Sequence, residues 1–466
     1  MATHTGPEVD ALTESALEHL WVYLREPSDM AEKGEPQIFV EGKGVHVTDA
    51  RGNEYIDAMS GLWLKNVGYG RHEIADAAYA QMLKLTYMPL GTTNEPAVLL
   101  AEKIASITPG DLSRCFFTSG GSESVETAIK LSRAYFKRVG EPTRYKFISR
   151  KGSYHGATMG ALALGGTPGF PKQDYEPMMP GFFHGPQPLP YRCEYGGTTP
   201  EECAERCANA IEDIIKFQGP DTVAAVVAEP ISSPYGAVVP GPNYWPMLRE
   251  ICDRYGCLLI ADEVITGFGR TGNMWGTQTY GMKPDMITCA KALSSSYIPI
   301  AALMISEPIY QAMVKESEKL GLFGHGSTYG GHPVAAAVAL ETLNIYEERD
   351  IVGRVRALGP RFQDGLRRHA DHPLIGEVRG VGLIAGIELV RDKATKEAFS
   401  PKLGVGGYFQ SQAQEEGLLI RAIGDTLAVC PPLIISEAEI DEPLGCIDRA
   451  LESTWTWVKE NGSVAA

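Results

Sequence analysis

The sequence lacks an excess of basic residues, an apolar run long enough to span a bilayer, and any pair of cysteines with CxxC spacing. With 42 Lys and Arg against 58 Asp and Glu, the formal net charge is −16. Nucleic acids and anionic membrane surfaces carry the same sign, so neither is expected as the main partner. A local basic site for a small anionic ligand remains compatible with this balance.

The nine cysteines are scattered along the chain. Cys203 and Cys207 are four residues apart, which is the spacing of one helix face. This pattern disfavours a disulfide framework and a zinc site, so we predict no metal ligand. Scattered cysteines are typical of a protein in a reducing compartment. The stretch from Met1 to Asp10 is polar and lacks the apolar segment of a signal peptide, so we expect a cytoplasmic protein.

Predicted strands and helices alternate over residues 75–345, which is typical of a mostly parallel sheet covered by helices on both faces. Short alternating runs at 38–56 and 375–390 predict smaller antiparallel sheets. We therefore expect an α/β fold with a large domain at 75–345 and a smaller α+β domain. Residues 1–74 and 346–466 are assigned to the small domain.

The sequence also predicts the local structure of three kinds of segment. An N-terminal helix is predicted from about Val9 to Leu24, because apolar residues recur there at helical spacing. Residues 165–198 are rich in Gly and Pro and predict an irregular segment. Capping-box spacing predicts helices that open at Thr199 and at Ser436.

Two charged residues follow consecutive apolar runs. Leu258–Val264 contains Asp262 at the end of a predicted buried strand, and Met286–Ala290 leads directly to Lys291. Ligands of open α/β sheets bind at the carboxyl ends of the strands. A buried lysine has a lowered pKa and can be the free amine that a Schiff base needs. A lysine and an acid so placed suggest pyridoxal 5′-phosphate (PLP); two ordinary solvated charges are the alternative.

Two glycine-rich turns are candidate anion sites. Ser119–Ser122 lies between a predicted strand and a predicted helix, where backbone N–H groups and the helix dipole can hold a phosphate. It is not a P-loop, because no GKS or GKT follows. Gly267–Gly272 matches GxGxxG, but residues 273–277 are not expected to open a helix, so a dinucleotide site is disfavoured.

Taken together, several separated motifs resemble the class III aminotransferases, the ω-aminotransferase group of fold-type I PLP enzymes, over nearly the whole chain from about Trp21. They occur in the family's order: Gly61-Leu62-Trp63 with Asn66–Gly70, Gly120–Glu123, Tyr154-His155-Gly156, Ala228-Glu229-Pro230, Ala261–Val264, Lys291, and Thr328-Tyr329 with Gly331-His332-Pro333. The resemblance implies a large PLP-binding domain and a small domain built from both termini.

The resemblance also implies a role for each matched residue. Lys291 would form the Schiff base with PLP and shuttle the proton, and Asp262 would pair with the ring nitrogen. Gly121 and Ser122 would hold the phosphate, with Thr328 reaching the phosphate of a partner subunit. The remaining roles are Tyr154 stacked on one ring face, Val264 packed on the other, and Glu229 near the phenolic oxygen and the substrate. His155, His325, His332 and Glu263 are expected to be structural.

Within the family, the chain resembles the amine:pyruvate transaminases. There Trp63 would wall the substrate pocket and Arg421 would bind the carboxylate of pyruvate. This implies ping-pong transfer of an amino group from a primary amine or ω-amino acid to pyruvate, in a homodimer, or a tetramer, with active sites at the interface. Alternatives are a 2-oxoglutarate-dependent or decarboxylating aminotransferase, an aminomutase and, more distantly, an NAD-dependent dehydrogenase. The donor is left open among β-alanine, taurine, a polyamine and an aryl-alkyl amine.

Overall fold

The computed structural model describes residues 6–461, apart from 24, 25, 27, 29, 31, 33–35, 168–171 and the side chain of residue 316. Its largest sheet has seven strands, and only β10 runs antiparallel to its neighbours. The prediction of a mostly parallel sheet is therefore confirmed. The order across the sheet is β4 (Arg114–Thr118), β10 (Ala301–Ile305), β9 (Met286–Cys289), β8 (Leu258–Asp262), β7 (Val223–Ala228), β5 (Lys146–Arg150) and β6 (Phe182–Gly185).

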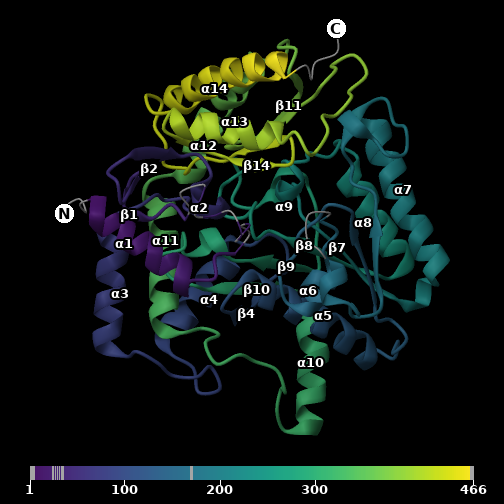
Figure 1. Ribbon diagram of the computed structural model, residues 1–466. Helices are drawn as coiled ribbons and strands as arrows, with labels where there is room; N and C mark the ends of the chain where they lie inside the picture. Colours follow the sequence, from purple (N-terminus) through teal and green to yellow (C-terminus); the bar gives the residue numbers. More distant parts are fainter. Residues whose placement is uncertain are drawn as a thin grey trace.

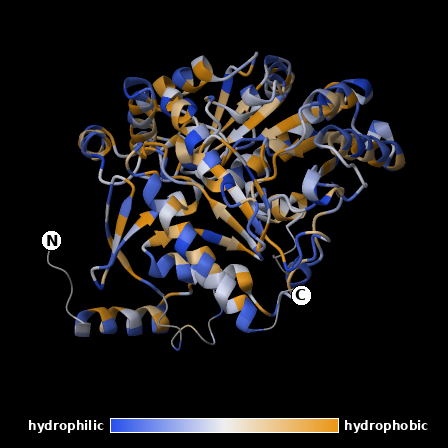
Figure 2. Cartoon of the chain, turned by 90° about the horizontal axis from the view of Figure 1, so that it is seen from above, coloured by the Kyte–Doolittle hydropathy of each residue, from blue (hydrophilic) through white to orange (hydrophobic). Residues whose placement is uncertain are grey.

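The central strands of this sheet are buried on both faces. Every residue of β7, β8, β9 and β10 is buried, which explains why these strands have continuous apolar sequences. One face packs against α5 (Gly121–Arg138), α6 (Met159–Leu164) and α10 (Glu307–Leu320). The other contacts α4 (Glu95–Ile107), α7 (Pro200–Gln218), α8 (Tyr244–Tyr255) and α11 (Pro333–Glu348). The hydrophobic strands lie in the middle of the molecule in Figure 2.

The first small sheet joins distant parts of the chain. It contains β1 (Phe39–Lys43), β2 (His46–Asp49) and β3 (Glu54–Asp57), which are antiparallel as predicted. The two-residue strand β13 (Leu418–Leu419) adds to β3 in parallel. This pairing supports the prediction that both termini build the small domain. The boundaries at 74 and 345 stay predictions.

The second small sheet is antiparallel and lies near the C-terminus. Its order is β11 (Ile375–Val381), β12 (Ile384–Leu389), β15 (Thr426–Val429) and β14 (Arg421–Ile423). The helices α12 (Ile351–Arg367), α13 (Val405–Glu415) and α14 (Asp441–Glu460) gather around it at the top of Figure 1. β14 places Arg421 on the side of this sheet that approaches Trp63.

The helix α7 opens as its sequence predicts. Thr199 is the N-cap, and its Oγ1 accepts from the backbone N–H of Glu202 at 3.2 Å. The Glu202 carboxylate in turn accepts from the N–H of Thr198 at 2.9 Å, one residue before the N-cap. The first bond satisfies a donor that the first helical turn cannot satisfy itself, and the second fixes the residue before the N-cap.

Several local expectations need correction. The N-terminal helix is α1 (Gly6–His19), shorter than predicted, and the predicted end at Leu24 lies outside the described residues. The segment predicted as irregular contains the edge strand β6, which is too short to show a period. Residues 168–171 of that segment also lie outside the described residues. The capping box at Ser436 and Glu439 forms, but it encloses a turn, and α14 begins only at Asp441.

No described helix is both long and apolar enough to cross a membrane. The remaining helices are α2 (Ser60–Trp63), α3 (His72–Lys84) and the one-turn α9 (Gly276–Thr279). The start of α9 differs from the expectation that residues 273–277 open no helix. Its first N–H groups, from Gly276 and Thr277, donate to the buried Glu263 carboxylate at 2.9 and 2.6 Å. These donors are therefore not available to a dinucleotide phosphate, and Glu263 has the structural role expected of it.

Candidate active site

A cavity of about 300 Å³ opens at the carboxyl end of β8. Its walls come from β8 and from the segments that follow β4, β5, β7 and β9, which lie far apart in the sequence. This is the place where open α/β sheets bind ligands. Of the residues predicted for the site, seven line this cavity: Gly121, Ser122, Tyr154, Glu229, Asp262, Val264 and Lys291.

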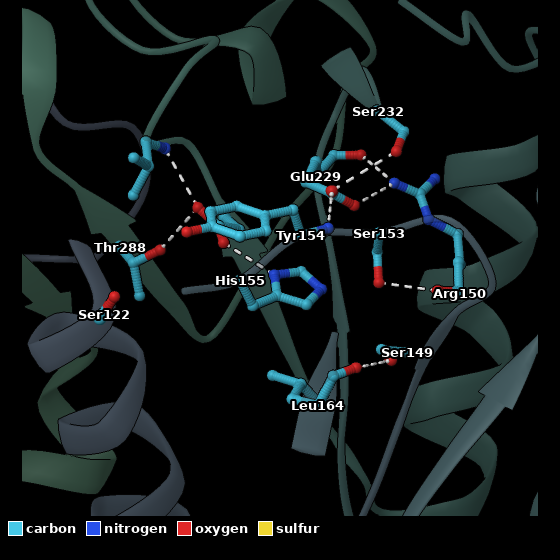
Figure 3. A network of polar contacts seen from close by, with 12 residues as sticks. Ser122, Ser149, Arg150, Ser153, Tyr154, His155, Leu164, Glu229, Ser232 and Thr288 are labelled. Carbon is cyan, nitrogen blue, oxygen red and sulfur yellow. Dashed lines mark hydrogen bonds and ion pairs between the residues drawn. The ribbon is translucent and has the colours of Figure 1, made fainter. Parts of the chain in front are cut away.

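The Asp262 carboxylate is held by three hydrogen bonds, two of them from His155 and Thr288, which are labelled in Figure 3. Its Oδ1 accepts from the backbone N–H of Val264 and from the hydroxyl of Thr288, each at 3.1 Å. Its Oδ2 lies 2.7 Å from Nδ1 of His155, which donates because a carboxylate can only accept. Thr288 pairs with Asp262 across the parallel strands β8 and β9. The orientation of the carboxylate is therefore fixed from three directions.

His155 belongs to the site, beyond the general structural role expected of it. Its side chain is buried, and Nε2 has no hydrogen-bond partner among the described residues. Burial lowers the pKa of His155, but the charge of Glu229 and the hydrogen bond to Asp262 raise it more, so the pKa lies above its usual value. His155 therefore adds positive character beside the Asp262 carboxylate.

Lys291 lies at the start of a short 3₁₀ turn that follows β9. Its backbone has φ of 47°, in the left-handed region that non-glycine residues rarely adopt. Such strain is typical of functional sites, where the surrounding structure enforces it. Burial lowers the pKa of the Lys291 ammonium to about 8, although the negative charge of Asp262 opposes the shift. A substantial fraction of the neutral amine is therefore present at mildly alkaline pH.

Glu229 is part of a buried ion pair that the sequence did not reveal. Its Oε2 lies 2.9 Å from Nη2 of Arg150, and the two side chains are 7% and 1% exposed. Its Oε1 accepts from the backbone N–H of Tyr154 at 3.1 Å and from the hydroxyl of Ser232 at 3.4 Å. Arg150 ends the strand β5, so its position at a strand end is the signal that could have identified it.

A narrow cradle lies where α5 begins. A Cβ atom at Gly121 would lie 3.1 Å from Cγ2 of Val264, so glycine lets these two segments approach closely. A Cβ at Gly156 would lie 2.4 Å from Oγ of Ser122, and Gly156 has φ of 135°. The Ser122 hydroxyl accepts from the N–H of Ala157 at 3.0 Å and keeps its own proton to donate. The start of α5 offers unpaired N–H groups, which suits a phosphate.

Trp63 and Arg421 lie next to the cavity. The ring of Trp63 is 5.6 Å from Nζ of Lys291 and 5.0 Å from Cζ of Arg421. Among the residues that the structure describes, Arg421 has no ion-pair partner, and burial lowers its pKa. Burial raises the pKa of the Tyr154 hydroxyl, while the nearby charge of Arg421 opposes this shift. Tyr154, Trp63 and Arg421 thus form one wall near Lys291.

Thr328 is the one predicted site residue that lies apart from this group. It is exposed and is not among the residues that line the cavity of its own chain. Its carbonyl accepts from the hydroxyl of Tyr87 at 2.9 Å. A role for Thr328 therefore depends on a second chain.

Comparison with known proteins agrees with this geometry. The family model of class-III aminotransferases matches residues 30–451. The putrescine–pyruvate aminotransferase of Pseudomonas aeruginosa is 42% identical, and the match covers 91% of this chain and 92% of that protein. Gamma aminobutyrate transaminase 1, mitochondrial, of Solanum lycopersicum is 40% identical over 91% of this chain and 83% of its own. The crystal structure of the ω-transaminase from Pseudomonas jessenii in complex with PMP has a TM-score of 0.93 and 40% identity, with coverage of 96% and 99%.

The fold and the site define a fold-type I PLP-dependent transferase. The chain belongs to the class-III aminotransferase family, whose cofactor is PLP. The cavity fits that cofactor. It combines an amine that can be neutral, a carboxylate with fixed orientation for a ring nitrogen, and a glycine-lined helix start for a phosphate.

The buried pair between Arg150 and Glu229 gives a prediction for stability. Arg150→Met leaves the Glu229 carboxylate buried without its partner, which should destabilise the fold by about 3 kcal/mol. The double variant Arg150→Met/Glu229→Gln should recover part of this loss, because no unpaired charge remains. The thermal unfolding midpoint measures both effects.

The matched control is Arg254→Met, which removes an exposed arginine paired with Glu212 and Glu250. Its midpoint should change little. Equal losses for Arg150→Met and Arg254→Met would show that the buried pair has no special importance.

Proposed function

We propose that this protein is an ω-aminotransferase that moves the amino group of a primary amine or ω-amino acid to pyruvate. The products are an aldehyde or ketone and alanine. The observation that carries the proposal is the position of Lys291. Its amine, with a pKa lowered to about 8, shares one cavity with Asp262 and lies beside the ring of Trp63.

Each residue of the site would have its own role in the reaction. When bound, PLP supplies a carbonyl carbon for the amine and a ring that takes up electrons from the substrate carbon. Lys291 would hold the cofactor and then use its free Nζ to take the proton from the carbon that bears the amino group. Asp262 would keep the ring nitrogen protonated, and Gly121 with Ser122 would bind the phosphate. Tyr154 and Val264 would enclose the ring, with Glu229 near the phenolic oxygen.

A pyruvate acceptor is supported by the wall that Arg421 and Trp63 form. One guanidinium binds one carboxylate through two parallel hydrogen bonds, and pyruvate has one carboxylate. Arg421 has no ion-pair partner among the described residues, so its hydrogen-bond donors are available. One relative is named a putrescine–pyruvate aminotransferase. The name of another, a gamma aminobutyrate transaminase, is compatible with an ω-amino acid as the donor. A 2-oxoglutarate-dependent aminotransferase stays the second candidate.

We also propose a homodimer, with Thr328 reaching the phosphate site of the partner. An apolar surface supports this: the end of α3, the segment that follows it and residues 322–329 expose Tyr79, Met82, Leu83, Tyr87, Leu322, Phe323 and Tyr329. Leu83 is 73% exposed and Tyr329 64% exposed. Tyr87 contacts Tyr329 edge to face at 6.4 Å, so the two parts are continuous. Contiguous exposed apolar surface marks interaction sites.

The nine cysteines are all free thiols in the structure. They support the proposal of a reducing, cytoplasmic location, which cell fractionation would test.

The visible absorption spectrum of the purified holoenzyme tests the proposed reaction. A donor amine alone should bleach the band of the bound cofactor, and pyruvate should restore it with alanine as product. Lys291→Ala should show no turnover, because no amine then moves the proton. Restoration by 2-oxoglutarate but not by pyruvate would contradict the proposed acceptor, and normal turnover by Lys291→Ala would contradict the mechanism.

Arg421 gives a prediction about the acceptor alone. Arg421→Ala should raise KM for pyruvate at least about tenfold, because a charged hydrogen bond contributes about 1.5–3 kcal/mol. The rate of the first half-reaction with a donor that lacks a carboxylate should change far less. Stopped-flow measurement of each half-reaction separates the two. Arg391→Ala, at an exposed ion pair with Glu397, is the control and should change neither. Equal loss in both half-reactions would exclude a role in acceptor binding.

The proposed homodimer predicts the mass in solution. Sedimentation of the holoenzyme should give twice the mass of one chain, or four times if dimers pair. Replacing Leu83 and Tyr329 by Asp should shift the protein toward the monomer, because buried carboxylates would face an apolar interface. A wild-type monomer at micromolar concentration would contradict the proposal.

A further inference from the structure

Three cysteines meet near the start of α7, the helix at the right edge of Figure 1. Cys193 comes from the turn that follows the 3₁₀ helix Pro190–Arg192, and Cys203 and Cys207 lie one turn apart on α7. The three sulfur atoms all lie within 4.8 Å of one another, and those of Cys203 and Cys207 are 4.0 Å apart. The sequence spacing alone disfavoured a metal here, because it did not show that Cys193 folds back onto the helix.

The sulfur positions suit a metal ion better than a disulfide within the helix. A tetrahedral zinc ion with Zn–S bonds of about 2.3 Å places its sulfurs roughly 3.8 Å apart, so small movements would complete the site. A disulfide needs an S–S distance of about 2.05 Å. The sulfur atoms of Cys203 and Cys207, on one face of α7, are 4.0 Å apart. Cys203 and Cys207 are fully buried, and Cys193 is partly exposed, so an ion can enter beside Cys193.

The turn at Cys193 holds its sulfur in place. The N–H of Gly196 donates to the carbonyl of Cys193 at 3.0 Å. The N–H groups of Gly197 and Tyr195 bond to the sulfur and fix its position. A Cβ atom at Gly197 would lie 2.5 Å from the backbone nitrogen of Cys203, so glycine is required for the turn to contact α7.

Positive charge lies beside the cluster. Arg206 donates to the carbonyls of Tyr195 and Gly196 at 2.9 and 3.0 Å, which fixes its guanidinium on the same turn. Three thiolates and a divalent ion together carry one negative charge. Arg206 and the positive end of the α7 dipole favour that charge, and the Glu202 carboxylate at the same helix start opposes it.

Gln187 lies beside the cluster. Its carbonyl accepts from the thiol of Cys207 at 3.5 Å. Its side chain is 5% exposed, and Oε1 has no hydrogen-bond partner among the described residues. The Gln187 amide also donates to Ser232 at 2.9 Å, and Ser232 donates to Glu229, so the cluster adjoins the support of the active site.

We propose that Cys193, Cys203 and Cys207 bind one zinc ion through three thiolates, with a water molecule at the fourth position. Zinc prefers a tetrahedral arrangement of ligands and binds well to soft thiolates. Binding would release the three thiol protons to the solvent, and no electron transfer is involved. The ion would tie the Cys193 turn to α7.

Zinc content of the untagged, full-length holoenzyme tests the site. The protein is kept reduced, incubated with zinc sulfate and separated from free metal by gel filtration. Elemental mass spectrometry should find one zinc per chain, and competition with a chromogenic chelator gives the affinity. Cys193→Ser should bind zinc at least about tenfold more weakly, since one of three ligands is lost. Zinc should raise the thermal unfolding midpoint of the wild type and not of Cys193→Ser.

Cys446→Ser is the matched control. This buried cysteine lies on α14 and donates to the carbonyl of Glu416 at 3.1 Å, a bond that serine can keep. It should retain the wild-type zinc content. Cys203→Ala gives a second test if Cys193→Ser folds poorly, as judged by its cofactor absorption. Wild type without zinc, unchanged zinc in both cluster variants, or a Cys193–Cys203 disulfide found by peptide mass spectrometry in the reduced-handled protein would overturn the proposal.

Discussion

The parallel register between β8 and β9 is the constraint on which the site depends. It sets Asp262 opposite Thr288, and three residues after Thr288 the chain reaches Lys291. A shift of one residue would turn every side chain of the strand to the other face. The register is fixed because both strands are buried on both faces and their side chains pack against helices from two sides. The acid and the lysine therefore share one cavity as a consequence of core packing.

Buried charge is the second organising feature of this site. Asp262 is bound by His155, and Glu229 by Arg150, so each carboxylate has a basic partner within hydrogen-bond distance. Lys291 has no such close partner in the salt bridges between described residues, and burial lowers the pKa of its amine. Pairing two carboxylates while leaving the lysine unpaired keeps the polar groups oriented and the amine able to lose its proton.

Local sequence patterns predicted the elements whose formation depends on neighbouring residues. The structure confirms the helix that opens at Thr199 and the continuous apolar runs of β8 and β9. The sequence did not predict the short edge strand β6 or the two-residue strand β13, because so few residues show no hydrophobic period. The sequence did not predict a role for Arg150, because that role comes from a contact with Glu229, 79 positions away in the chain.

The sequence by itself determined the class of fold and predicted Lys291 and Asp262 for the site, because ordered motifs and apolar runs consist of consecutive residues. Only the tertiary structure decided which residues meet. It placed His155 on Asp262, Arg421 on Trp63, Thr328 outside its own cavity and Cys193 on α7. Contacts of this kind join distant segments, and packing of the helices and sheets sets them. The spacing of residues within one segment does not predict where another segment will lie.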